Sequence, residues 1–383
     1  MENLQRLIAR AADGIINWAG IESALSSFAH PMAQTQQNPA YHGEGDVWTH
    51  TKLVCEELVK LDAYQALPTT RRQLLLLAAL LHDIGKISTT RWEEGTWISP
   101  NHALAGSKLA RRFLWEAYSG MPEKLWVRET VCSLIRFHSF PPHALADPEG
   151  RQKLMAIAAN GAQCPLFTLH LLCLLCEADA KGRICQDREE LAENILFCRE
   201  LAKESGCLMA PFPFPSDYTR YAYLSGRDIV PELELYDDTW GEVILLSGLP
   251  GTGKDTWIST NCPELPVISL DDVRKVHHIS PTENQRRVVD IAKQQAKEYL
   301  RKKQSFVWNA TDLSPMVRGT QIQLFTQYHA RVRLVYLETD WRECLRRNAS
   351  RRDAVPEAAV CHMLEDLIPP EAKEAHRVEW HCV

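Results

Sequence analysis

The sequence predicts a multidomain protein, with an all-α helical bundle followed by an α/β domain built on a parallel sheet. Amphipathic helical spacing recurs from the N-terminus to about residue 205, with little strand-like alternation. After residue 241, four short β-rich runs alternate with longer helical stretches, as in βαβ units. Between them, proline, aromatic and acidic residues follow no clear period. We therefore expect a helical domain at 1–206, a packed connector at 207–240 and an α/β domain at 241–383.

Particular runs of residues predict the helices of the first domain and the strands of the second. The amphipathic helical runs of the first domain are residues 2–21, 48–61, 71–85, 102–118 and 124–138. The β-rich runs of the second domain are residues 243–247, 266–270, 305–309 and 331–338. Parallel strands need helical crossovers, so the second set predicts one sheet with helices between its strands.

Composition limits the class of protein. The 383 residues are 45% hydrophobic and 24% charged, which is typical of a globular protein. The longest aliphatic run, Leu74 to Leu81, is far shorter than a membrane span, and the N-terminus lacks the apolar core of a signal peptide. Twelve scattered cysteines then favour reduced thiols and a cytoplasmic protein. The Cys173–Cys176 pair lies in an apolar helical run, where we expect buried core thiols.

The charge is uneven but nowhere strongly basic. Residues 1–240 hold 23 basic and 30 acidic residues, whereas residues 241–383 hold 20 and 19. A nucleic-acid binder that relies on bulk charge is therefore not indicated. Any contact with a polynucleotide should be local and involve few phosphates.

Six residues of the first domain have the types and positions of a metal site. They are His50, His82, Asp83, His102, His138 and Asp179. Each is expected at or near the end of a helix, where ligands from several helices can converge while the apolar faces stay buried. Asp46 is the expected N-cap of the helix that carries His50. Imidazole combined with carboxylate suits Mn, Fe, Co, Ni or Zn better than Mg²⁺.

This order of residues resembles the HD phosphohydrolase superfamily over about residues 40–200. The resemblance implies one metal in members with the shorter ligand set and two in members with two further histidines. On that pattern His50, His82, Asp83 and Asp179 would hold one divalent cation. Asp83 would bridge the two cations and hold the second one together with His102 and His138. This role makes Asp83 a catalytic residue. Two such cations would activate water against a phosphomonoester or phosphodiester.

Three further side chains are candidate substrate contacts of this site. Lys86 and Arg183 could neutralise phosphate oxygens. Lys86 could equally form a structural ion pair. His42, together with Glu44, comes just before the first ligand helix and is expected to line the pocket.

A phosphate-binding loop of the GxxxxGK type follows the first β-rich run of the second domain. The predicted nucleotide contacts are Gly248, Gly251, Thr252, Gly253, Lys254, Asp255 and Thr256. Glycines let backbone amides face the phosphates, and Lys254 reaches the β and γ phosphates. Ser or Thr usually follows the lysine and binds Mg²⁺, but Asp255 stands here. The loop predicts ATP or another NTP with Mg²⁺ and leaves the metal ligand open.

Two further features point to phosphoryl transfer. The second β-rich run is expected to end at Asp271, whose carboxylate could accept the proton of an attacking hydroxyl, with Arg274 three residues on. Asp272 is expected to point elsewhere, towards solvent or the following helix. After residue 340, a basic segment that includes Arg347 and Arg351 could close over the transferring group.

These features together resemble the kinase module of polynucleotide 5′-kinases, over about residues 241–383. The shared elements are the phosphate loop, the D-x-x-R sequence, the Asn309-x-Thr311 strand end and the RNxxR segment before Val-Pro. The resemblance implies that Asp271 is the general base and that Arg274 contacts an acceptor phosphate. Lys254 would then be catalytic.

The whole chain resembles the bacterial HD–polynucleotide kinase family. The resemblance implies an ATP-dependent 5′-OH polynucleotide kinase joined to a 2′,3′-cyclic phosphodiesterase and 2′(3′)-phosphatase. RNA ends would be the partner, with DNA left open, and an RNA ligase would act alongside. The enzyme alternative is an HD nucleotidase fused to a nucleoside or small-molecule kinase. The non-enzyme alternative is a regulator in which Asp255 turns the loop into a binding-only switch.

Overall fold

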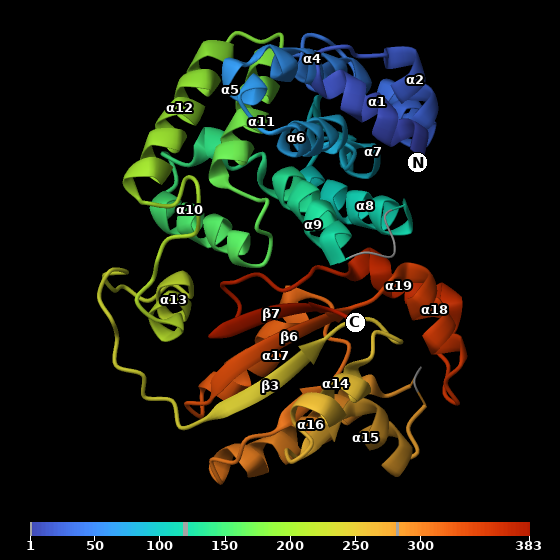
Figure 1. Cartoon of the computed structure of the whole chain (residues 1–383), viewed down its shortest axis with the longest axis vertical. Helices are drawn as coiled ribbons and strands as arrows, with labels where there is room; N and C mark the ends of the chain where they lie inside the picture. The colour runs from blue at the N-terminus through green and yellow to red at the C-terminus, as the bar shows by residue number, and fades with distance from the viewer. Residues whose placement is uncertain (1, 118–121, 281–282) are drawn as a thin grey trace. The chain divides into compact units, whose positions relative to one another are not determined.

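A computed structural model describes residues 2–117, 122–280 and 283–383. The chain divides after Phe212 into two compact units, a helical one and an α/β one (Figure 1). No helix in the described ranges is long and apolar enough to cross a bilayer. All twelve cysteines are free thiols, and Cys173 and Cys176 are buried as expected.

The first unit consists of helices and one small hairpin. Its elements are α1 (Glu2–Ala12), α2 (Trp18–Ala24), α3 (Ser26–Gln34), α4 (Val47–Lys60), α5 (Asp62–Gln65), α6 (Thr69–Leu81), α7 (Lys86–Thr89), β1 (Arg91–Glu93), β2 (Thr96–Ile98), α8 (His102–Ala117), α9 (Pro122–Phe137), η1 (Pro141–His143), α10 (Gly150–Ala159), η2 (Asn160–Ala162), α11 (Leu169–Gly182) and α12 (Arg188–Glu204). The run 2–21 is two helices instead of one, because Gly14 adopts a left-handed conformation and Asn17 caps α2.

Helix α6 is the centre of this unit. Its residues Leu74 to Leu81 are all buried, so this helix is apolar around its whole circumference. Helices α1, α4, α9 and α11 pack against it. The residues that follow its last turn, His82 and Asp83, therefore emerge in the interior of the unit.

The second unit begins with a short helix and continues as alternating strands and helices. Its elements are α13 (Asp217–Leu224), β3 (Glu242–Ser247), α14 (Lys254–Asn261), β4 (Val267–Ser269), α15 (Leu270–Val276), α16 (Gln285–Arg301), β5 (Val307–Asn309), α17 (Pro315–Thr326), β6 (Arg331–Glu338), α18 (Trp341–Ala349), α19 (Glu357–Asp366) and β7 (Arg377–Cys382). The Arg220 side chain in α13 donates to the backbone carbonyls of Ala372 and His376, which ties this segment to the α/β unit.

The sheet is parallel throughout, with strand order β4-β5-β3-β6-β7, so the expected parallel sheet is confirmed. Strand β7 was not expected from the sequence and extends the sheet at one edge. Alternate residues of β3 face opposite sides. Val243 and Leu245 pack in a core with α16 and α17, whereas Ile244 and Leu246 pack against α14.

The register brings three strand ends to one edge. Asn309 at the end of β5 pairs with Leu246 of β3 and with Ser269 of β4. The phosphate loop leaves β3 at this edge and α15 leaves β4. Ligands of parallel sheets bind outside the carboxyl ends of the strands, so this edge is where a ligand is expected.

Candidate functional site

Six metal-ligand candidates of the first unit lie at helix ends. His50 is in the first turn of α4, where the Asp46 carboxylate accepts from the Thr49 amide as the predicted N-cap. His82 and Asp83 follow α6, and His102 begins α8. His138 follows α9, and Asp179 lies in the last turn of α11. The interior of the bundle is therefore lined by ligands from five helices.

The six side chains meet around Asp83. Its Oδ2 atom lies 3.4 Å from His82 Nε2 and 3.8 Å from His50 Nε2. Its Oδ1 atom lies 3.5 Å from His102 Nε2 and 3.7 Å from His138 Nε2. The two carboxylate oxygens thus face two different pairs of histidines.

In the described part of the chain, three groups of ligand atoms are close enough to hold a cation each. One is His42, Glu44 and His50, and the other two are made of the six predicted ligands. Of these two, the first comprises His50, His82 and Asp179, and the second comprises Asp83, His102 and His138. His82 Nε2 and Asp83 Oδ1 are buried without a hydrogen-bond partner. Buried polar atoms are normally satisfied, so this donor set fits divalent cations with Asp83 between them.

Hydrogen bonds on the far side of each imidazole fix the direction of Nε2. The Nδ1 atoms of His82, His102 and His138 lie 2.7, 2.9 and 2.6 Å from the carbonyl oxygens of Ala79, Ser99 and Ile135. A neutral imidazole that donates from Nδ1 leaves Nε2 as a free ligand atom. Cys176 adds support, because its thiol donates to the His138 carbonyl.

Glu44 lies against the far side of the His50 ring, although His50 Nδ1 has no hydrogen-bond partner among the described residues. The Oε1 atom of Glu44 lies 2.8 Å from both His50 Nδ1 and His42 Nδ1, and its Oε2 atom accepts from the Ile184 amide. Burial acts to raise the pKa of Glu44, but these partners lower it well below its usual range. Burial also lowers the pKa of His42 to about 4, so His42 is neutral at physiological pH. The structure places His42 against this carboxylate at the edge of the cluster.

Two cations neutralise the carboxylates of the cluster. Lys86 Nζ lies 2.7 Å from Asp83 Oδ2 and donates to Gln37 Oε1. Arg183 forms two hydrogen bonds with Asp179. Although burial acts in the opposite direction, these charges help hold the pKa of each aspartate well below its usual range. Both carboxylates are therefore ionised, as metal ligands must be.

The pKa values of two buried histidines of the cluster are shifted in opposite directions. Burial lowers the pKa of His138 to about 3, so its ring is neutral. Burial would also lower the pKa of His82, but the Asp83 carboxylate overcomes this and raises it. A cation bound at His82 needs the neutral ring, so metal binding there competes with protonation.

The phosphate loop of the second unit has the conformation that its glycines permit. Gly248, Gly251 and Gly253 have φ angles of 152°, 87° and 82°. A Cβ atom on Gly248 would lie 2.5 Å from the Leu337 carbonyl oxygen, so a side chain is excluded there. Thr252 is buried, and its hydroxyl donates to the Leu249 carbonyl. The amides of Gly248 and Thr252 donate to the Thr311 and Leu249 carbonyls, so these two are engaged within the protein, with Thr252 as an internal brace.

Lys254 and Asp255 begin helix α14 at the mouth of this loop. Lys254 Nζ donates to the Gly248 and Leu249 carbonyls, and burial lowers its pKa to about 8. Asp255 Oδ1 accepts from Asn309 Nδ2 at 2.7 Å. Thr256 is exposed on the next position of α14. Asp255, which stands where this type of loop usually has Ser or Thr, is thus held in place by Asn309 at the end of β5.

A cavity of about 460 Å³ opens beside the loop, with Asp255, Asn309, Asp271, Asp272 and Arg351 in its lining.

The expected strand end at Asp271 is wrong by two residues. Strand β4 stops at Ser269, whose hydroxyl accepts from the Asp272 amide and starts α15. Both aspartates therefore lie in the first turn of a helix, and Asp272 lines the cavity instead of pointing elsewhere.

Two arginines contact Asp271. Arg274 Nη1 donates to Asp271 Oδ1 at 2.7 Å and also contacts Gln285 of α16. Arg351 Nη2 lies 3.6 Å from Asp271 Oδ2. The segment after α18 therefore reaches the same cavity as the D-x-x-R sequence, which the linear sequence does not show.

Helix α18 packs directly on the phosphate loop. A Cβ atom on Gly251 would lie 2.4 Å from the Cys344 carbonyl oxygen, and the Cys344 thiol donates to the Pro250 carbonyl. A Cβ atom on Gly253 would lie 3.5 Å from Arg347 Nη1, while Arg347 Nε donates to Glu343. Arg347 is thus beside the loop, as a nucleotide contact requires.

Sequence reasoning missed several residues that shape these sites. Gln37 and Gln285 hold Lys86 and Arg274, while Cys344 and Asn348 support the phosphate loop and the turn after α18. The partners of Gln37 and Cys344 are 49 and 94 positions away, so local spacing carries no signal for them. For Asn348 its place inside RNxxR was a usable signal.

Comparisons with known proteins agree with this division. Residues 47–165 match the family model of the HD domain, and residues 243–370 match that of the AAA domain. No curated protein matches the chain. A candidate kinase from Chloroflexus aurantiacus J-10-fl, of known crystal structure, is 19% identical over 38% of this chain and 86% of its own, with a TM-score of 0.33.

Proposed function

We propose that the protein heals broken RNA ends. The premise is that this chain joins an HD domain to a P-loop kinase-like domain. The second domain would phosphorylate a 5′-hydroxyl with ATP. The first domain would remove a 2′,3′-cyclic or terminal 2′(3′)-phosphate. One observation carries the proposal: the same chain holds two kinds of site. The first is a His/Asp cluster with ligand groups for two cations, and the second is a phosphate loop beside the Asp271–Arg274 ion pair. Ribonuclease cleavage leaves both kinds of unligatable end at once, so the two activities complement each other.

In the kinase reaction, Asp271 would accept the proton of the 5′-hydroxyl as its oxygen attacks the γ-phosphorus of ATP. The bond between the γ-phosphorus and the β–γ bridging oxygen breaks, and ADP leaves. Lys254 and the nearby Arg347 and Arg351 would offset the charge on the transferring group. Arg274, held between Asp271 and Gln285, would contact a phosphate of the acceptor.

In the hydrolytic reaction, divalent cations at the cluster would supply positive charge and lower the pKa of a bound water. His50, His82, Asp83 and Asp179 would hold one cation, and Asp83, His102 and His138 would hold the second. The backbone carbonyls keep the Nε2 atoms of His82, His102 and His138 directed at them. The histidine-rich donor set favours Mn, Co, Ni, Fe or Zn over Mg²⁺.

Lys86 and Arg183, which pair with Asp83 and Asp179, would contact phosphate oxygens if bound cations took over the neutralisation of these carboxylates. His42, neutral and beside Glu44, would line the same pocket. Twelve free thiols suit a reducing compartment, so we place the protein in the cytoplasm, where an RNA ligase could join the healed ends.

The test supplies full-length protein with [γ-³²P]ATP and either a 5′-OH RNA oligonucleotide or free nucleosides. The proposal expects label on the oligonucleotide, and, in a second assay with Mn²⁺, Co²⁺ or Ni²⁺, release of a terminal 2′,3′-cyclic phosphate. Label on nucleosides alone would favour a nucleotidase fused to a small-molecule kinase. ATP binding without transfer to any acceptor would favour the regulator, in which Asp255 makes the loop a switch.

A further inference from the structure

Helix α16 concentrates the positive charge of the second unit. Residues 285–301 hold five basic and two acidic residues, and Lys302 and Lys303 follow directly, whereas residues 241–383 as a whole hold 20 basic and 19 acidic residues. The remainder of the unit is therefore acidic on balance. A local excess of this size on one helix calls for a partner of opposite charge.

Four of these cations form a stripe along the helix: Arg286, Lys293, Lys297 and Arg301. They are separated by seven, four and four residues, so they fall on one face. The buried row Val288, Ala292, Ala296 and Leu300 lies about a third of a turn away around the helix. At 1.5 Å per residue the stripe is about 22 Å long. Asp290 lies on the same face and is its single acidic member.

No cation of the stripe forms an ion pair with any other described residue. Elsewhere in the unit, arginines such as Arg274, Arg318 and Arg333 are all paired with carboxylates or hydrogen-bonded. Like charges four residues apart on a helix repel one another and cost stability. The stripe therefore carries uncompensated charge, available to an external anion.

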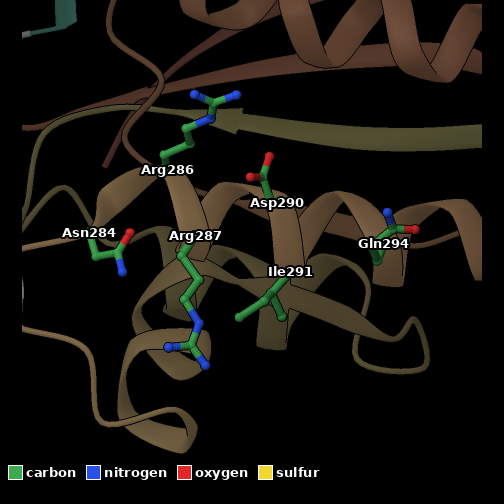
Figure 2. A pocket seen from close by; sticks show the side chains of 6 residues that line it. All are labelled: Asn284, Arg286, Arg287, Asp290, Ile291 and Gln294. Atoms are coloured by element: carbon green, nitrogen blue, oxygen red, sulfur yellow. The ribbon is translucent and has the colours of Figure 1, made fainter.

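A shallow groove of about 290 Å³ lies at the N-terminal end of the stripe. It is lined by Asn284, Arg286, Arg287, Asp290, Ile291 and Gln294. Figure 2 shows Arg286 and Asp290 on one side of the helix, and Arg287 and Ile291 on the other. Arg287 therefore does not belong to the stripe, although it is the next residue.

The stripe begins beside the acceptor site. Gln285 Oε1 accepts from Arg274 Nε at 3.0 Å and from Nη2 at 2.8 Å. Arg274 in turn donates to Asp271 at 2.7 Å. A chain of direct contacts thus leads from Asp271, where the 5′-hydroxyl would lie, to the first turn of α16.

We propose that this stripe binds the backbone phosphates of a single-stranded polynucleotide whose 5′ end lies at Asp271. The inference rests on the proposed kinase function and adds how the enzyme would select polynucleotides over nucleotides. Four cations would contact about four phosphates, which predicts a log-log salt slope of about −3 for binding. Such a local site agrees with the near-neutral charge of the whole unit.

The test compares Arg286→Gln/Lys293→Gln with wild-type full-length protein in two measurements. The first is binding of a fluorescent 12-nucleotide 5′-OH RNA by anisotropy. The second is the KM of that RNA and of a nucleoside 3′-monophosphate in the kinase assay. We expect about tenfold weaker RNA binding, a salt slope shallower by about 1.4, and a nucleoside 3′-monophosphate KM within twofold of wild type. Glutamine suits a helix, so the fold should persist.

Arg287→Gln is the positional control and is compared with Arg286→Gln alone, because each removes one arginine, from opposite sides of the helix. Arg287→Gln should retain RNA binding within about twofold. Equal losses for RNA and nucleoside 3′-monophosphate, or equal effects of Arg287→Gln and Arg286→Gln, would overturn the stripe. Stripe-dependent RNA binding without any 5′ phosphorylation would overturn the proposed reaction and leave the stripe standing.

Discussion

Asp271 is the residue on which the proposed transfer chemistry depends. It is in the first turn of α15, lines the cavity beside the phosphate loop and contacts Arg274 and Arg351. We expect Asp271→Asn to retain ATP affinity and to lower turnover by about 10²–10⁴, because an amide cannot accept the proton at neutral pH. ATP binding by equilibrium titration and kcat with a 5′-OH oligonucleotide measure the two effects separately.

Asp272 is the control for this prediction. It lines the same cavity, but Asp271 holds both arginine contacts. Asp272→Asn should therefore lower turnover by about tenfold or less. The reverse ranking of the two variants would make Asp272 the base.

Asp312 is a buried carboxylate that the proposed chemistry does not use. Burial raises its pKa to about 7, although Arg318 and the Trp308 indole hydrogen bond act in the opposite direction. The folded state then binds a proton that the unfolded state, with a pKa near 3.8, has lost. Its stabilising effect is therefore complete below about pH 4 and disappears as the pH rises through about 7.

Asp312→Asn removes this pH dependence, because the amide stays neutral and can still accept from Trp308. We expect the variant to be more stable than wild type at pH 8 by about 2–4 kcal/mol, with the difference falling to about 1 kcal/mol at pH 4.5. Calorimetric melting of the second unit at both pH values measures this. Equal shifts at both pH values would mean that Asp312 is ionised in the folded protein.

At the scale of elements, helix ends position the chemistry of both units. In the first unit five helices bring one or two ligands each to a shared centre, and α6 is apolar all round because the other helices surround it. In the second unit the carboxyl ends of β3, β4 and β5 meet at one edge. Each site therefore depends on the packing of whole elements and tolerates little displacement of any one of them.

The arrangement of helix ends predicts two cations in the first unit. Metal analysis of full-length protein loaded with Mn²⁺ or Co²⁺ should approach two ions per chain. His102→Ala should lower this to about one, because α8 supplies a ligand to the second position alone. His30→Ala, which changes an exposed histidine of α3, should retain both ions. One ion in the wild type, unaffected by His102→Ala, would contradict the bridging role of Asp83.

At the scale of the whole molecule, the two activities should be separable. The clusters belong to different compact units, before and after Phe212. Lys254→Ala should therefore lower 5′ phosphorylation by at least about 10²-fold and leave phosphohydrolysis near wild type. Asp83→Ala should do the reverse. Parallel assays of both reactions on each folded variant provide the measurement, and loss of both activities from either change would indicate one composite site.

The sequence by itself determined the local features of this protein. Helical periodicity, the apolar run 74–81, the Asp46 cap and the glycine pattern of the phosphate loop are all short-range signals, because each depends on residues within a few turns or one loop. The α/β class of the second domain followed from its four β-rich runs. The fifth strand, β7, was not predicted, because local pattern alone cannot identify the strand with which a short run pairs.

The tertiary structure decided which distant residues meet. His50 and Asp179 are 129 positions apart, yet their side chains are 3.0 Å apart, and Asp83 lies between two pairs of histidines from four helices. Asp255 is fixed by Asn309, and Arg274 by Gln285. Such contacts arise from the packing of whole helices and the register of strands, which sum many weak interactions across the chain. For this reason spacing could nominate the ligands, while the fold determined their grouping and the direction in which each one points.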